Sequence, residues 1–243
     1  MLKTLVRVVW LPAVIASAVM AGGLFGASPA AAAPAKYKQI STPGKYSQWA
    51  YVEVATYAYS RPSKFASKVM KVSTRTSDKT DNVVYIDGSV NNRGLWYKVL
   101  LPSVHGTWGW VPASRLGAPQ STSTQVVMDL AARSLTLIRA GRTVLTAGVG
   151  IGKAGTPTPP GEFYIRSKMR GFSSPAYGVR AMGTSAKSKV LTDWPGGGIV
   201  GIHGTNEPGI LPGRVSHGCV RVRNETILRI YKIVSVGTPV TIK

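Results

Sequence analysis

Three kinds of reactive side chain are scarce in this sequence of 243 residues. It contains one cysteine (Cys219), three histidines and nine acidic residues in total. A single cysteine cannot form a disulfide within the chain, so the thiol either bridges to another molecule or stays free and reactive. Cys219, His203 and His217 could together hold zinc, but carboxylates are few and His105 is the only other histidine. We therefore expect neither a metal ion nor a cofactor.

The N-terminal segment is typical of a signal peptide. Two basic residues precede an apolar stretch at 8–24, and the small residues at 30–32 fit the A-x-A pattern of signal peptidases. We expect residues 1–32 to be removed, which leaves 243 − 32 = 211 residues. The alternative is an uncleaved membrane anchor, because the apolar stretch is nearly long enough to span a bilayer.

The scarcity of acidic residues leaves a large positive charge. Thirty Lys and Arg residues give a formal net charge of +21 at pH 7. Such an excess either aids solubility or indicates an anionic partner surface. Since the protein is expected to be secreted or to act in the cell envelope, anionic cell-wall polymers fit better than nucleic acid. We expect contact with the membrane only through the signal peptide before cleavage.

The first part of the mature chain has short β-type runs separated by turn residues. We expect a linker at 33–46 and a domain at 47–117, in which runs such as WAYVEVATYAYS and DNVVYIDG predict strands. Four tryptophans, at 49, 96, 108 and 110, lie in this domain. They form either the core of a small barrel or an aromatic ligand-binding groove, and we favour the core.

The second part of the chain predicts another β domain with one clear helix. We expect a linker at 118–125 and a domain at 126–243, which begins with three strands separated by turns at 131–133 and 140–141. The sequence NETILRIYKIV has apolar residues at helical spacing and Asn224 as the expected N-cap. The final residues, TPVTIK, predict a closing strand.

The two remaining histidines and the cysteine lie close together in the sequence. GGGIVGIHG predicts a strand that ends at His203, and RVSHGCVRV predicts a second strand. The twelve residues between His203 and Ser216 are rich in Gly and Pro, and they can return the chain and bring His203 beside Cys219. On the second strand, one face would carry His217, Cys219 and Arg221, and the other Ser216, Gly218 and Val220.

This arrangement suits nucleophilic catalysis. A free thiol has a pKa of about 8.5, so it needs a base or an imidazolium beside it, which His203 can supply. Gly218 lets a substrate carbonyl approach the backbone, where the Cys219 amide can donate to the oxyanion. Arg221 can hold a substrate carboxylate. The plainer alternatives are that Cys219 is a small buried hydrophobe, that His203 caps a strand end and that Arg221 is a solvated edge charge.

Two resemblances to known families add to this interpretation. YSRPSKFASKVMKV, GLWYKV and GTWGWVPASRL resemble bacterial SH3-like domains over residues 47–117, which implies a small β-barrel that often binds cell-wall peptides. TPTPPGEFYI, IHGT, the Gly/Pro loop and SHGCVRV resemble the catalytic domain of the YkuD-type L,D-transpeptidases over residues 126–243. This implies a mainly β fold: a sandwich or barrel-like catalytic domain with one or two short helices.

The second resemblance also implies roles for individual residues. Cys219 matches the acyl-accepting nucleophile and His203 the general base and acid, which the Gly204 carbonyl orients. Ser216 and His217 belong to the motif, and we take His217 as auxiliary. Two features depart from the family: the loop between His203 and Ser216 is short, and Arg221 stands where one branch has Asn.

The implied reaction takes place on the stem peptides of peptidoglycan. Cys219 attacks the carbonyl of the diaminoacyl residue of a tetrapeptide stem and releases D-alanine, and an amine of a neighbouring stem then resolves the thioester into a 3→3 cross-link. The sequence has no S-x-x-K motif, which penicillin-binding enzymes with D,D-chemistry require. Two alternatives stay open: an L,D-carboxypeptidase in which water resolves the thioester, and a non-catalytic wall-binding protein. We expect an active site to depress the thiol pKa, and an idle thiol to keep its ordinary value.

Overall fold

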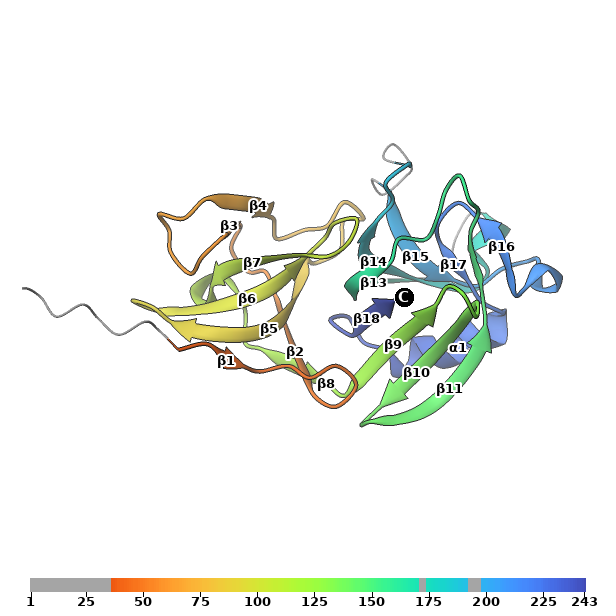
Figure 1. Cartoon of the computed structure of the whole chain (residues 1–243), viewed down its shortest axis with the longest axis horizontal. Helices are drawn as coiled ribbons and strands as arrows, with labels where there is room; N and C mark the ends of the chain where they lie inside the picture. Colours follow the sequence, from red (N-terminus) through yellow and green to blue (C-terminus); the bar gives the residue numbers. More distant parts are fainter. Residues whose placement is uncertain (1–35, 171–173, 192–197) are drawn as a thin grey trace, which may run out of the picture. The chain divides into compact units, whose positions relative to one another are not determined.

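The computed structural model describes residues 36–170, 174–191 and 198–243. The expected signal peptide at 1–32 lies outside these residues. No helix within the described ranges is long and apolar enough to cross a membrane. Residues Ala35–Lys243 form one compact unit that contains two β-sheets. The mainly β fold class is confirmed (Figure 1).

The first sheet contains eight strands in the order β4-β3-β7-β6-β5-β2-β8, with β1 paired to β5. Its strands are β1 (Lys38–Gln39), β2 (Ser47–Tyr51), β3 (Thr56–Tyr59), β4 (Lys68–Val72), β5 (Val83–Asn91), β6 (Leu95–Leu101), β7 (Thr107–Pro112) and β8 (Gln120–Thr122), and the 3₁₀ turn η1 (Ala113–Arg115) follows β7. Trp49 and Trp96 are buried and the other two tryptophans of this sheet are partly buried, in agreement with a core role. The SH3-like assignment stays a prediction.

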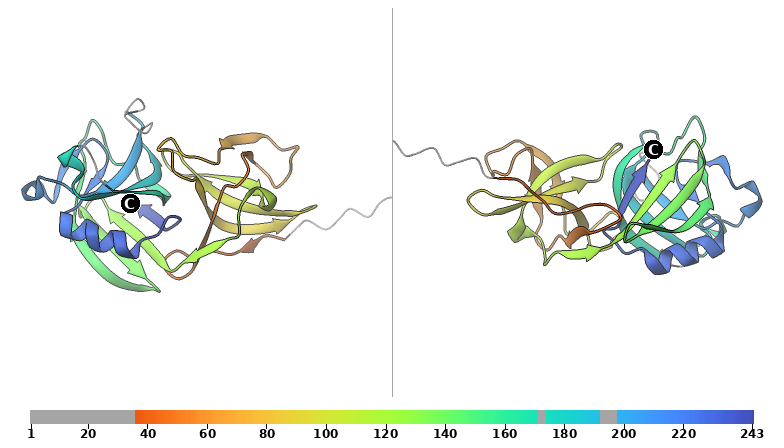
Figure 2. Two further views of the ribbon diagram at one scale, coloured as in Figure 1. Left: turned by 180° about the vertical axis from the view of Figure 1, so that it is seen from behind. Right: turned by 60° about the horizontal axis from the view of Figure 1, so that its bottom comes forward.

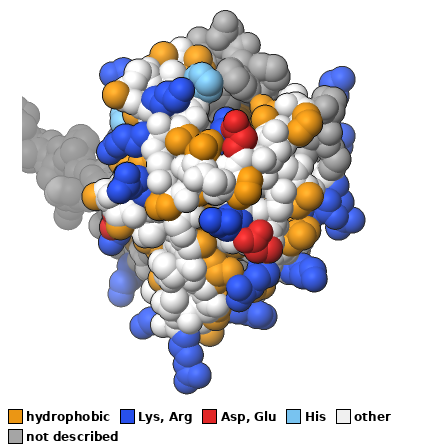
Figure 3. Space-filling model, turned by 90° about the vertical axis from the view of Figure 1, so that its right-hand side faces the viewer, with side chains coloured by type: hydrophobic (Ala, Val, Ile, Leu, Met, Phe, Trp, Pro, Cys, Tyr) orange, Lys and Arg blue, Asp and Glu red, His pale blue; other side chains and the backbone are white. Residues whose placement is uncertain are grey.

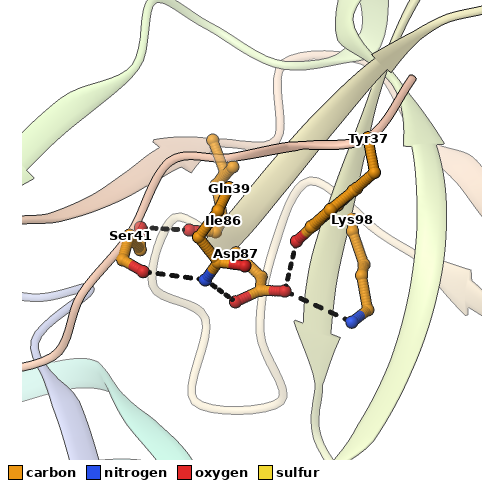
Figure 4. Close-up of polar contacts among 6 residues, drawn as sticks. All are labelled: Tyr37, Gln39, Ser41, Ile86, Asp87 and Lys98. Carbon is orange, nitrogen blue, oxygen red and sulfur yellow. Dashed lines mark hydrogen bonds and ion pairs between the residues drawn. The ribbon is translucent and has the colours of Figure 1, made fainter.

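Both stretches that we expected as linkers contribute a strand to this sheet. β8 lies within 118–125, and β1 lies within 33–46. The Asp87 carboxylate on β5 holds the β1 segment: it accepts hydrogen bonds from the Tyr37 hydroxyl (2.5 Å) and the Gln39 amide (2.9 Å), and pairs with the Lys98 ammonium (3.2 Å) (Figure 4). The domain boundaries therefore remain a prediction.

The second sheet contains ten strands in the order β11-β10-β9-β18-β13-β14-β15-β17-β12-β16. Its elements are β9 (Thr124–Asp129), β10 (Ser134–Arg139), β11 (Arg142–Gly148), β12 (Gly150–Gly152), β13 (Gly161–Arg170), η2 (Pro175–Tyr177), β14 (Arg180–Lys187), β15 (Ile199–His203), η3 (Pro208–Ile210), β16 (Gly213–Ser216), β17 (Val220–Arg221), α1 (Asn224–Ile233) and β18 (Pro239–Ile242). Alternate residues of β9 and β10, such as Met128 and Leu135, point into one core because side chains alternate along a strand. The three strands expected after residue 125, their two turns and the closing strand are confirmed.

The helix α1 packs on this sheet through an apolar face (Figure 2). Ile227, Ile230 and Tyr231 are buried in the core that also contains Met182 of β14. The helix is confirmed, but the expected cap is wrong. Arg223 occupies the N-cap position without a side-chain cap bond, and Asn224 is the first residue of the helix, with its side chain bonded to the backbone of Val179 and Thr205.

Candidate active site

Two short strands bring the cysteine and one histidine to the same part of the sheet. β15 and β17 pair in parallel, with Ile202 opposite Val220 and His203 opposite Arg221. Cys219 directly precedes β17, and its sulfur accepts a hydrogen bond of 3.4 Å from the backbone N–H of Gly201. The side chains of His203 and Cys219 line the same cavity, so the two residues face one common space.

The segment before Cys219 is not the continuous strand that we expected. β16 ends at Ser216, the next three residues are irregular, and β17 begins at Val220. Gly218 has φ +116°, a conformation that L-residues with a side chain rarely adopt, so the chain bends there. The prediction of one alternating strand from 216 to 221 is therefore wrong, and Gly218 serves the bend.

A cavity of about 280 Å³ has Cys219 in its lining. Five of the seven residues predicted for the site line it: His203, Ser216, His217, Cys219 and Arg221. Gly204 and Gly218 are not among the lining residues and support it through their backbones. The other walls come mainly from the η2 segment and from residues around β15, and include Ala176, Tyr177, Leu191, Ile199 and Val200. The site is thus a partly apolar hollow with a thiol, two imidazoles and one guanidinium in its lining.

His203 is buried and fixed in one tautomer. Its Nδ1 lies 2.6 Å from the Gly204 carbonyl oxygen. A carbonyl only accepts hydrogen bonds, so Nδ1 carries the proton and Nε2 keeps its lone pair. The pKa of His203 is lowered to about 4: burial is the main cause, the bond to Gly204 opposes it, and the Arg221 charge adds a smaller lowering. The imidazole is therefore neutral at pH 7 and can act as a base.

The thiol of Cys219 is also neutral at rest. Burial raises its pKa above the ordinary value, although the Gly201 N–H bond and the Arg221 charge act in the opposite direction. Our expectation of a depressed thiol pKa is therefore wrong. The physical reason is that burial desolvates the sulfur, while the imidazole that lines the same cavity is neutral, so no imidazolium stabilises the thiolate.

This charge state predicts slow alkylation of Cys219 at neutral pH. Only the thiolate reacts, so the rate of carbamidomethylation by iodoacetamide should rise with an apparent pKa above that of the same thiol in the urea-unfolded protein. Because the chain has a single cysteine, the unfolded protein is a matched reference. Mass spectrometry across a pH series measures both rates. A folded-state pKa below the unfolded one would show a thiolate–imidazolium pair and contradict the neutral state.

Comparisons with known proteins identify the family of this site. The model of the YkuD L,D-transpeptidase catalytic domain matches residues 123–242. The YkuD protein of Bacillus subtilis strain 168 is 33% identical over 124 residues, which are 51% of this chain and 68% of that protein. The chain belongs to the L,D-transpeptidase family.

Solved structures of L,D-transpeptidases resemble the chain less closely. LdtMt1, solved in complex with imipenem, is 20% identical, with 68% of this chain and 74% of that one covered and a TM-score of 0.41. The catalytic domain of the Enterococcus faecium enzyme, solved by NMR, is 26% identical, with 49% and 96% covered and a TM-score of 0.37. The family assignment depends on the family model and on the Bacillus relative.

Two hydroxyl groups shape the bend that carries Cys219. The Ser216 hydroxyl donates to the Cys219 carbonyl (2.5 Å) and accepts from the Gly218 N–H (3.1 Å). Thr158, which is buried, donates to the Gly218 carbonyl (2.8 Å) and accepts from the Gly152 N–H (2.9 Å). Sequence reasoning missed Thr158, although it lies in the TPTPPGEF stretch that carried the resemblance.

Arg221 is not the solvated edge charge that we weighed as an alternative. Its side chain is 16% exposed, lines the cavity and pairs with the Glu207 carboxylate at 3.3 Å. Its buried Nε has no hydrogen-bond partner in the described structure. His217, in contrast, is exposed at the cavity lining. Within the described ranges no three His, Cys, Asp or Glu side chains are grouped so that they could hold a metal ion.

Proposed function

We propose that this protein is an exported cysteine L,D-transpeptidase that forms 3→3 cross-links in peptidoglycan through a thioester on Cys219. The family acts on peptidoglycan stem peptides and transfers acyl groups, so the class of reaction follows from membership. The observation that carries the finer proposal is the Nδ1–Gly204 bond of 2.6 Å, because it leaves the basic nitrogen of His203 free in the cavity that also contains Cys219.

The first half-reaction transfers the acyl group to the enzyme. The Cys219 sulfur attacks the carbonyl carbon of the diaminoacyl residue while Nε2 of His203 takes the thiol proton. The Cys219 N–H is the proposed donor to the developing oxyanion. As the C–N bond to D-alanine breaks, His203 returns its proton to the leaving amine, and the products are a thioester and free D-alanine.

The second half-reaction restores the thiol. An amine of a neighbouring stem attacks the thioester carbonyl and gives a proton to Nε2 of His203. The C–S bond breaks and the departing sulfur takes that proton, so the thiol and the neutral imidazole return. A neutral pair suits both steps, because the same nitrogen must accept a proton and release it within one cycle.

The charges around the cavity fit anionic substrates. Arg221 is the proposed partner of a substrate carboxylate, which it would bind by sharing or displacing Glu207. Lys and Arg side chains far outnumber acidic ones on the face shown in Figure 3, and the whole chain carries +21. We propose that this charge attracts the protein to anionic cell-wall polymers, and that the SH3-like region binds the wall.

Product analysis tests the proposed function. With a tetrapeptide-containing muropeptide, a transpeptidase should release D-alanine and form dimers with a 3→3 link, which mass spectrometry and fragmentation identify. Tripeptide without dimer would instead show the L,D-carboxypeptidase, in which water resolves the thioester. If neither dimer nor tripeptide forms, the result would contradict an enzymatic function and favour a non-catalytic wall-binding protein.

A further inference from the structure

The side chain of Asn224 connects two segments that both touch His203. Its Oδ1 accepts hydrogen bonds from the backbone N–H of Thr205 (3.2 Å) and of Val179 (3.3 Å). Thr205 follows β15 after His203 and Gly204, whereas Val179 lies between η2 and β14. One amide oxygen therefore joins segments that are about 25 residues apart in the sequence and come from two different connections of the sheet.

The backbone around this oxygen leaves room for it only because two neighbouring residues are glycines. A Cβ added at Gly178 would lie 2.3 Å from Oδ1, and one added at Gly204 would lie 2.2 Å from it. Such distances are far below van der Waals contact, so the oxygen occupies the space that two glycines leave open. The oxygen therefore lies close to the backbones of both segments, while the Asn224 side chain is partly exposed.

Each of these two segments holds one side of the His203 ring. Gly204, which directly precedes Thr205, accepts the Nδ1–H bond of His203. Tyr177, two residues before Val179, places its ring centroid 5.0 Å from that of His203. Asn224 is thus connected to both groups that fix the orientation of the imidazole, although it does not line the cavity.

We propose that Asn224 is a positioning residue for His203: its amide oxygen fixes the Gly204–Thr205 and Gly178–Val179 peptides, and thereby keeps the Gly204 carbonyl aligned with Nδ1–H. This inference depends on the proposed role of His203 as the base. A displaced carbonyl would let the ring rotate or change tautomer, and the proton would then leave Nδ1 for the nitrogen that must act as base. Misplacement of a reacting group by about 1 Å can cost about 10²-fold in rate.

Two substitutions of Asn224 separate positioning from simple stability. Asn224→Ala removes the acceptor and should lower the rate of Cys219 acylation by a carbapenem about 10- to 100-fold. Asn224→Asp keeps an acceptor oxygen in the same place and should restore most of the rate at pH 7. Its negative charge should also raise the pKa of His203, so the acid limb of the rate profile should move to higher pH. Glu225→Gln, at an exposed neighbouring position of α1, is the matched control and should behave as wild type.

A direct view of the imidazole completes the test. ¹⁵N and ¹H NMR of histidine-labelled protein should show a hydrogen-bonded Nδ1–H for His203 in wild type and Asn224→Asp, and its loss in Asn224→Ala. A purely structural role predicts a lower Tm with the Nδ1–H signal and the acylation rate retained, which would overturn the proposal. An Asp variant as slow as the Ala variant at pH 7 would also overturn it. If the wild type itself is not acylated, the proposed function fails, and the NMR comparison still decides whether Asn224 positions the ring.

Discussion

Replacing Cys219 with alanine is expected to lower the rate of D-alanine release from tetrapeptide stems by more than about 1000-fold, because the acyl group then has no acceptor on the enzyme. No other thiol exists in the chain to take over. D-alanine release and muropeptide products, measured over a long incubation, give the rate. The fold should persist, since the substitution removes one sulfur at the edge of a cavity.

A matched control for this variant changes another side chain of the same cavity. Ser174→Ala also lies in the lining but has no part in the proposed chemistry, so it should keep turnover within a few-fold of wild type. Turnover in Cys219→Ala comparable to that of Ser174→Ala would show that the thiol is not the nucleophile.

Replacing His203 with alanine is expected to lower the rate of acylation by about 10²- to 10⁴-fold, the usual contribution of a positioned general base. The thiol pKa is raised above its ordinary value, so without a base little thiolate forms at pH 7. Stopped-flow or mass-spectrometric acylation rates measure the effect, with circular dichroism to show that the fold remains. Added imidazole should recover part of the rate, because the lost side chain leaves space in the cavity that Cys219 also lines.

The other two histidines serve as controls for the His203→Ala variant. His105→Ala and His217→Ala should keep most of the acylation rate. Retained turnover in His203→Ala together with a loss in His217→Ala would assign the role of general base to His217.

The acylation rate of the wild type should not change near pH 7 through protonation of His203. It should fall only as the pH drops towards about 4, where His203 becomes protonated and no longer acts as a base. A fall centred at about 6.5, the ordinary histidine pKa, would contradict the buried neutral imidazole.

The β architecture was predictable because its information is local. Alternation of apolar and polar residues predicts β9 and β10, and the turns between them follow from short polar runs. Cys219 and His203 could be found because their residue types are rare in this chain and lie only 16 positions apart. Rarity and spacing are properties of the sequence, so no structure was needed to select these two residues.

The supporting residues could not be predicted because their partners are distant backbone groups. Thr158 bonds to the carbonyl of Gly218, sixty positions away, and Asn224 bonds to two amides, one of them 45 positions away. Local sequence around Asn224 favours an N-cap, and the tertiary contact overrides that preference. The bend at Gly218 depends on a backbone angle, and the raised thiol pKa of Cys219 depends on burial. Neither property can be read from the local sequence.

The intact mass of the mature wild-type protein after incubation with imipenem tests the central claim most directly. The account predicts one covalent adduct per chain, which peptide mapping places on Cys219 and which is absent from Cys219→Ala. A wild-type protein that stays unmodified under conditions where its substrate is turned over, or an equal adduct on Cys219→Ala, would contradict the assignment of this thiol as the acyl acceptor.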